Sequence, residues 1–233
     1  MCHRCHRWIF FRYLSERFPQ AQGGMPVIVR QLMKRIDASR GAPDNYSIQA
    51  VSRELAARGT DLRRVYAQFG DANRHPATAY DEGRFYRAAP ASRTWTLTRQ
   101  RHDSRWQRVR LDHLATTTVQ VKPGAAFKGQ HLRIAVDLPR TSTGVAAVVT
   151  RYDDRGRSRT KLVRLSKAGN GRAVVPFDAR TTTRIDVTLS NAGTRYRCWY
   201  GSVTSHGTPV TYSCSGRPQD DGVAMSYRVS TVR

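Results

Sequence analysis

The chain has 233 residues, which corresponds to one or two domains. Its hydrophobic fraction of 39% and charged fraction of 24% are typical of folded globular proteins. The sequence has no run of about 18 apolar residues, which excludes a transmembrane helix, and no apolar stretch near the start long enough for a signal peptide. The net charge of +23 is the one extreme value.

This positive charge predicts attraction to anionic polymers or surfaces. Only five of the 40 basic residues are lysine, and such an excess of arginine is typical of a GC-rich genome. No run of five like charges forms a basic arm. We therefore expect most of the arginines to lie on solvated faces, and we expect no specific nucleic-acid binding.

The first third of the chain has the periodicity of short helices. The segment 8–18 is an aromatic-rich helix that ends before Pro19, and Pro26 suits the first turn of a second helix. A third helix has Ser47 as its expected N-cap and ends at Gly59, and a fourth begins at Asp61. We interpret residues 1–75 as a helical segment of about four helices, which is too small for a large core of its own.

Residues 76–92 contain Pro76, Gly83 and Pro90 and predict a surface linker. From residue 93 to residue 233 the apolar residues alternate with a period of two, which is typical of strands. We expect about nine strands, near 94–98, 106–111, 116–121, 132–138, 145–149, 162–165, 172–177, 184–189 and 223–229. Asp153–Gly156 predicts a hairpin turn. The fold class is therefore α+β, with an antiparallel, jelly-roll-like β-sandwich after the helices.

The sequence lacks the common catalytic motifs. H-E-x-x-H, G-x-S-x-G, the P-loop and the dinucleotide-binding pattern G-x-G-x-x-G are all missing. No catalytic residue is predicted, and no cofactor is expected in this chain.

Two pairs of carboxylates are weak candidates for calcium, namely Asp153 with Asp154 and Asp220 with Asp221. Neighbouring residues of a strand point to opposite faces, however, and aspartates in turns mostly accept hydrogen bonds from backbone N–H groups. The second interpretation is the stronger one.

Cys198 and Cys214 flank a hairpin-like loop, and a disulfide between them would contribute about 3 kcal/mol. Such a bond indicates an oxidising compartment, and two reduced, buried cysteines are the alternative. Trp199, Tyr200 and Tyr212 near this loop are candidates for stacking against a sugar ligand. Trp95 and Trp106 on the early strands are expected to belong to the core instead.

Several segments of the sequence carry a family resemblance, namely 8–19, 26–30, 46–50, 69–73, 174–178, 187–192 and 194–198, together with Cys214 and Asp220–Asp221. These segments resemble the C-terminal portion of secreted bacterial zinc metallopeptidases of the H-E-x-x-H type. The first four segments resemble the helices that complete the catalytic domain, and the others resemble the C-terminal β-sandwich of the family.

The resemblance implies an extracellular location for the full-length relative, and a zinc ion only there. The zinc-binding half of the family pattern and a signal peptide are missing from this sequence, so we expect a reading frame that begins late. The expected function is then that of a non-catalytic fragment, whose sandwich binds substrate or an anionic surface polysaccharide, or supports folding. Its partner would be that surface or the missing catalytic half. A stand-alone module that binds carbohydrate or the cell envelope is the alternative, and nucleic-acid binding through the basic surface is less favoured.

Overall fold

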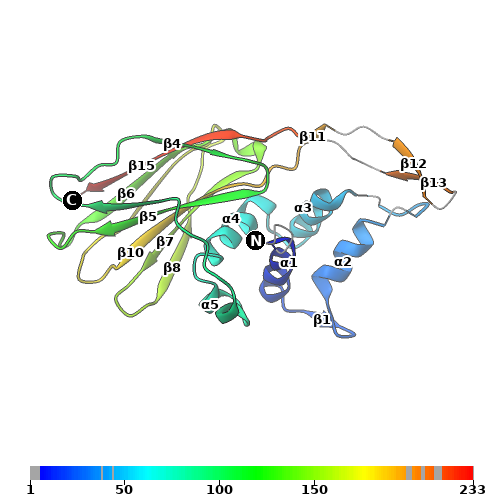
Figure 1. The fold of residues 1–233 in the computed structure, drawn as a ribbon, viewed down its shortest axis with the longest axis horizontal. Helices are drawn as coiled ribbons and strands as arrows, with labels where there is room; N and C mark the ends of the chain where they lie inside the picture. The colour runs from blue at the N-terminus through cyan, green and yellow to red at the C-terminus, as the bar shows by residue number, and fades with distance from the viewer. Residues whose placement is uncertain are drawn as a thin grey trace. The chain divides into compact units, whose positions relative to one another are not determined.

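A computed structural model describes residues 6–37, 39–43, 45–197, 201–205, 208–212 and 217–232, with only the backbone course given for 201–205 and 208–212. Contacts divide the chain into two compact units (Figure 1). Met1–Leu62 and Thr194–Gln219 form the helical unit, and Arg63–Gly193 and Asp220–Arg233 form the sandwich unit. None of the helices in the described part of the chain is long and apolar enough to cross a membrane.

The helical unit contains three helices and three short two-stranded ladders among its described residues. Their bounds are α1 His6–Arg17, α2 Val27–Arg35, α3 Ser47–Ala57, β1 Ala21–Gln22, β2 Met25–Pro26, β11 Tyr196–Arg197, β12 Gly201–Ser205, β13 Thr208–Tyr212 and β14 Arg217–Pro218. Leu14, Ile28, Leu32 and Leu55 are buried.

Helix α3 begins one residue earlier than the expected cap at Ser47 implies. Ser47 is its first helical residue and Tyr46 is the N-cap, with no side-chain hydrogen bond to the helix. The Tyr46 hydroxyl instead donates to the backbone oxygen of Thr194. The predicted end is confirmed, because Gly59 has a φ of 72° and its N–H and that of Thr60 donate to Ala56 and Leu55.

The sandwich unit consists of two stacked sheets, which confirms the predicted α+β class with a β-sandwich body. The first sheet has the order β3 (Arg93–Leu97), β5 (Ala115–Pro123), β10 (Arg184–Asn191), β7 (Val145–Tyr152) and β8 (Ser158–Leu162). The second has the order β4 (Gln107–Leu111), β15 (Val223–Val232), β6 (His131–Asp137) and β9 (Asn170–Pro176). The chain passes repeatedly between the sheets, as a jelly-roll-like layout predicts.

Two details of the strands differ from the prediction. β3 pairs with β5 in parallel, whereas every other strand pair of the two sheets is antiparallel. β8 directly follows the turn at Asp153–Gly156, four residues earlier than expected, because the hairpin is tight. Leu165 forms only an isolated bridge with Gly171.

The core lies between the sheets. Its largest fully buried side chains are Tyr227, Phe127, Phe177, Leu97, Leu132, Ile134, Ile185, Leu189 and Met225. Trp95 packs against this cluster, and its Nε1 donates to the Tyr227 hydroxyl at 3.3 Å. Trp106 is 51% exposed, so its predicted core position is wrong; it precedes β4, where the alternation begins.

Helix α4 (Leu62–Ala72) belongs to the sandwich unit rather than to the other helices. Its Ala67 packs against Ala146 and Val148 on the outer face of β7. Gly70 allows the helix to approach β5, because a Cβ there would lie 2.7 Å from Thr116 Cγ2. The compact unit therefore begins within the segment 1–75 that we expected to be separate.

Residues 76–92 do not form a plain linker. They contain helix α5 (Pro76–Ala79) and the 3-10 turn η1 (Gly83–Phe85). Buried Tyr80 donates to Asn73 Oδ1 at 2.7 Å, and the N–H of Ala89 donates to the backbone oxygen of Asn73 at the same distance. These bonds attach the segment to the end of α4, so it is part of the sandwich unit.

Candidate functional site

Four loops and the end of β15 meet at one end of the sandwich, which we call the loop end. In the first sheet, the ends of β3, β5 and β7 lie level with the start of β10, and in the second sheet the start of β6 lies level with the ends of β9 and β15 (Figure 1). The loop end therefore carries the β3–β4, β5–β6, β7–β8 and β9–β10 loops. Loops at one end of a rigid sandwich are a common place for ligand binding.

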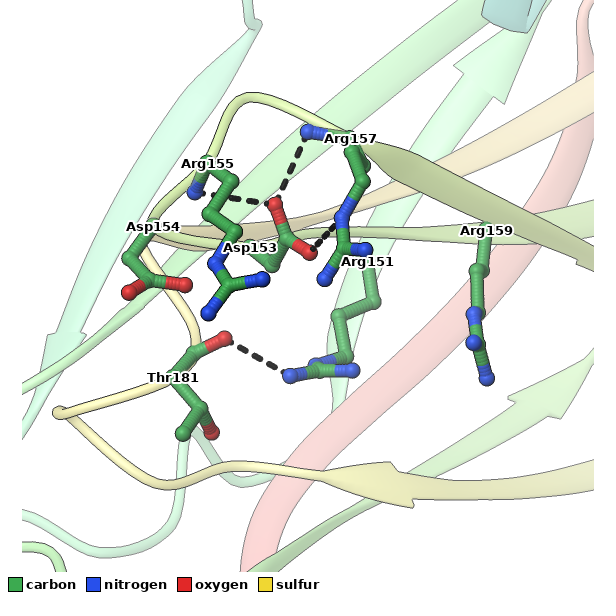
Figure 2. Close-up of a pocket in the computed structure, with 7 residues that line it drawn as sticks. All are labelled: Arg151, Asp153, Asp154, Arg155, Arg157, Arg159 and Thr181. Atoms are coloured by element: carbon green, nitrogen blue, oxygen red, sulfur yellow. Dashed lines mark hydrogen bonds and ion pairs between the residues drawn. The ribbon is translucent and has the colours of Figure 1, made fainter.

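A cavity of about 300 Å³ lies at this end, beside the β7–β8 hairpin. We call it the arginine cavity, and its lining residues are Arg151, Asp153, Asp154, Arg155, Arg157, Arg159 and Thr181 (Figure 2). Arginines dominate the lining, so the cavity attracts anions.

The strand pattern brings Arg151 to this position. Val145, Ala147 and Val149 of β7 are fully buried in the core, and Arg151 continues the same face two residues further along the strand. Arg159 is its direct partner on β8, so the two guanidinium groups are carried on the same face. The face that is apolar along the middle of β7 therefore becomes cationic at the loop end.

Two of the four arginines are held by the protein. Arg151 donates from Nε to Thr182 Oγ1 at 2.8 Å and from Nη2 to the backbone oxygen of Thr181 at 2.7 Å. Arg157 Nε donates to Asp153 Oδ2 at 2.8 Å. The guanidinium groups of Arg155 and Arg159 make no hydrogen bond or ion pair with residues that the structure describes, and Figure 2 shows both side chains extending away from the turn.

Asp153 fixes the turn. Its Oδ1 accepts hydrogen bonds from the N–H groups of Arg155 and Arg157 at 3.0 and 2.8 Å, and Gly156 has a φ of 73°. Desolvation raises the pKa of this carboxyl, but the hydrogen bonds from Arg157 and Arg155 together hold the pKa below its usual value. The interpretation of this aspartate as a turn residue is confirmed, and the ionised carboxylate makes the hairpin a stiff support.

The two candidate calcium pairs have different surroundings. Asp153 is engaged by the turn, and Asp154 is exposed among the arginines of the cavity, where the local charge suits an anion better than a cation. Asp220 and Asp221 lie at the opposite end of the sandwich, where Asp221 Oδ1 accepts the N–H of His113 at 2.8 Å. Over the described residues, no three His, Cys, Asp or Glu side chains gather as metal ligands would.

The other predicted site residues lie outside the side chains that the structure describes. Cys198, Cys214, Trp199 and Tyr200 lie outside the described residues, and Tyr212 belongs to β13, for which only the backbone course is described. The predicted disulfide and the sugar-stacking aromatics stay predictions. The arginine cavity was missed from the sequence, although counting outward from the Asp153–Gly156 turn places Arg151 opposite Arg159.

The comparisons with known proteins give no family. The sequence matches no protein-family model. No curated protein matches it significantly.

Several solved structures are similar to part of this chain, at low identity and low TM-score. The pre-peptidase C-terminal domain of collagenase from Bacillus anthracis is 9% identical, covers 63% of this chain and 100% of its own, and has a TM-score of 0.33. PliG from Aeromonas hydrophila, a periplasmic inhibitor of g-type lysozyme, is 10% identical over 60% of this chain and 98% of its own, with a TM-score of 0.29. The CBM22-1–GH10 modules of xylanase 10B from Clostridium thermocellum are 10% identical over 54% of this chain and 26% of theirs, with a TM-score of 0.24. TM-scores of 0.33 and below support no conclusion about function, so the site is interpreted from its own chemistry.

Proposed function

We propose that the sandwich unit is a non-catalytic accessory module that binds an acidic polysaccharide through the arginine cavity. The observation that carries this proposal is the direct pairing of Arg151 with Arg159 across β7 and β8. Like charges at directly opposite positions of a sheet destabilise it. A bound anion between the two guanidinium groups would offset that repulsion.

The geometry around this pair suits a binding role. Arg151 is held by Thr181 and Thr182, so little side-chain freedom is lost when it binds a ligand. Arg155 and Arg159 have donors left for bidentate hydrogen bonds to carboxylate or sulfate groups.

The ligand chemistry follows from the rest of the lining. Asp154 is exposed at the cavity, and a carboxylate there can accept hydrogen bonds from hydroxyl groups. A polysaccharide that carries acidic groups offers hydroxyl donors for Asp154 as well as anions for the arginines, whereas a DNA backbone offers phosphates without hydroxyl donors. The lining also contains no aromatic side chain on which a base would stack. These features favour an acidic polysaccharide over nucleic acid.

This proposal is in keeping with the resemblance to the tail of an exported peptidase. In such a protein the sandwich would hold the enzyme at a substrate or cell-surface polymer, and residues 1–62 would belong with the catalytic part. We propose no catalytic step for this chain and no cofactor.

The test is a direct binding measurement with a matched control. Isothermal titration calorimetry with polygalacturonate would compare the wild-type chain, Arg155→Ala/Arg159→Ala, and Arg108→Ala/Arg172→Ala. The control pair lies on β4 and β9 of the other sheet, is exposed, and removes the same charge. We expect the cavity variant to lose about tenfold in affinity, or about 1.4 kcal/mol, and the control to change less than about twofold.

Two results would count against the proposal. Equal losses in both variants would mean that the net charge alone attracts the polymer, without a site. Tighter binding of single-stranded DNA than of polygalacturonate by the wild-type chain would make nucleic acid the ligand class instead.

A further inference from the structure

A second cavity lies at the same loop end and takes no part in the site described above. Its volume is about 610 Å³, within the range of about 300–1,000 Å³ that is usual for small-molecule sites. The lining residues are Arg99, His102, Phe127, Gln130, Thr231 and Val232. They come from the β3–β4 loop, the β5–β6 loop and the end of β15.

Gln130 gives this cavity an unused polar atom. Its Oε1 is shielded from solvent and accepts no hydrogen bond from the residues that the structure describes. A shielded acceptor that lacks a donor is costly, and a ligand hydroxyl group in the cavity would satisfy it.

The other lining residues complete a mixed surface. Arg99 and His102 are exposed at the cavity, and the Arg99 guanidinium makes no hydrogen bond or ion pair with any described residue. The backbone oxygen of His102 accepts the N–H of Thr231 at 2.9 Å, which fixes the rim. Phe127 is 2% exposed and packs against Phe177, so the floor is apolar and firm. The cavity thus offers the Arg99 cation, the Gln130 amide and the apolar floor at Phe127, together with the hydroxyl-bearing Thr231. This combination matches a sugar that carries a carboxylate.

One loop connects the two cavities. In the β9–β10 loop, Phe177 and Ala179 donate their N–H groups to the backbone oxygens of Gln130 and Phe127 at 2.8 and 3.0 Å. Thr181, two residues further, lines the arginine cavity and accepts from Arg151. Asp178 Oδ2 also accepts the N–H of Gly129 at 2.7 Å, which fastens this loop to the β5–β6 loop. The β9–β10 loop therefore links the lining of the second cavity to that of the arginine cavity through backbone hydrogen bonds.

We propose that the second cavity is a subsite for a uronic-acid residue, and that one acidic polysaccharide chain occupies both cavities across the β9–β10 loop. This inference rests on the proposed function and extends it from a charge-based contact to recognition of a particular kind of sugar residue. Arg99 would pair with the carboxylate, and Gln130 Oε1 would accept a sugar hydroxyl. Occupation of two linked sites makes the second contact intramolecular, so affinity should rise steeply once the ligand is long enough to span them.

The experiment uses oligogalacturonates of increasing length, titrated into the full chain and followed by calorimetry. For the wild type we expect a step of about tenfold or more in affinity at the length that reaches both cavities. Arg99→Ala should abolish the step while leaving the binding of shorter oligomers unchanged. Gln130→Glu should also abolish the step, because the new carboxylate would repel the carboxylate of the ligand. Oligomers whose carboxylates are reduced to alcohols should show no step.

The outcomes separate the two proposals. If the wild type binds none of the oligomers, the proposed function itself is wrong. If it binds and Arg155→Ala/Arg159→Ala weakens binding, but Arg99→Ala and Gln130→Glu match the wild type at every length, the arginine cavity stands and the subsite is overturned. Arg99 is exposed and has no structural partner among the described residues, so this variant tests the subsite even if Gln130→Glu proves unstable.

Discussion

The Tyr152 hydroxyl group lies 2.7 Å from Nδ1 of His75, although 77 residues separate the two in the chain. Their rings meet edge to face with centroids 5.6 Å apart. Burial lowers the pKa of His75 and raises that of Tyr152. Close by, Arg74 Nε donates to fully buried Asp186 at 3.1 Å. These polar contacts join the end of α4 to β7 and β10 on the outer face of the first sheet, and β7 is also the strand that carries Arg151.

We expect Tyr152→Phe to destabilise the sandwich unit by about 1–2 kcal/mol, since it leaves a partly buried imidazole nitrogen without its partner. Urea denaturation followed by circular dichroism would measure the change. Tyr86→Phe is the matched control, because its hydroxyl makes a long, exposed bond of 3.2 Å to Glu82. Equal losses in the two variants would contradict a special role for the Tyr152–His75 contact.

Asn191 should be among the most sensitive polar residues of the sandwich. It is fully buried, and its Nδ2 donates to the backbone oxygens of Asp220, Asp112 and Leu111 at 2.6, 3.1 and 3.3 Å. Asn191→Ala leaves buried carbonyl groups unpaired, so we expect a loss of about 3 kcal/mol. The exposed Asn170→Ala should cost less than about 0.5 kcal/mol in the same denaturation assay. A cost for Asn191→Ala near that of the control would show that water replaces these bonds.

Asp178 should make the stability depend on acid pH. Hydrogen bonds from the Arg180 side chain and N–H, and then from the Gly129 N–H, hold its pKa far below the usual value. A lowered carboxyl pKa stabilises the folded state above the unfolded pKa of about 3.9, and this contribution is lost as the pH falls toward the folded pKa. Asp178→Asn should therefore melt at a lower temperature than the wild type at pH 7, with a gap that narrows below about pH 4. Thermal melts between pH 2 and 7 would check this, and a constant gap would rule out the titration of Asp178 as the cause.

Two turn glycines provide a graded test of the backbone. Gly156 has a φ of 73° with nothing within 4 Å of an added Cβ, so Gly156→Ala should cost only the backbone strain of about 1–2 kcal/mol. Gly169 has a φ of 97°, and an added Cβ would lie 2.0 Å from the backbone oxygen of Leu138. Gly169→Ala should cost clearly more and lower the yield of soluble protein. Differential scanning fluorimetry would compare the melting temperatures of the two variants. An equal decrease would mean that the backbone at Leu138, just after β6, can move aside.

The strands were predictable because their signal is local. Val145–Val149 is apolar at every position, and the structure buries both faces of β7, one against the second sheet and one against α4. The parallel pairing of β3 with β5 was not predictable, because the alternation in Arg93–Leu97 is the same for either direction. The assignment of α4 to the sandwich also depends on contacts with residues more than 70 positions away, such as Ala67 with Ala146.

Only part of the candidate site could be predicted from the sequence. The Asp153–Gly156 turn was predicted correctly, and with it the role of Asp153. The arginines beside it could not be distinguished from the other basic residues, of which the chain has 40. Only the register of the hairpin distinguishes Arg151 and Arg159 from the others, by setting them opposite each other. The second cavity is built from loops that are far apart in sequence, so no local pattern indicates it.

The segment Thr194–Gln219 leaves the sandwich after β10 and returns just before β15. Its two ends are adjacent, because a Cβ on Gly193 would lie 3.1 Å from Asp220, and Asn191 bonds to both flanking residues. The excursion is thus a cassette inserted at a single closed point of the scaffold. Replacing it with a short glycine-rich bridge should leave the strand registers of the two sandwich sheets intact and shorten the loop that folding must close.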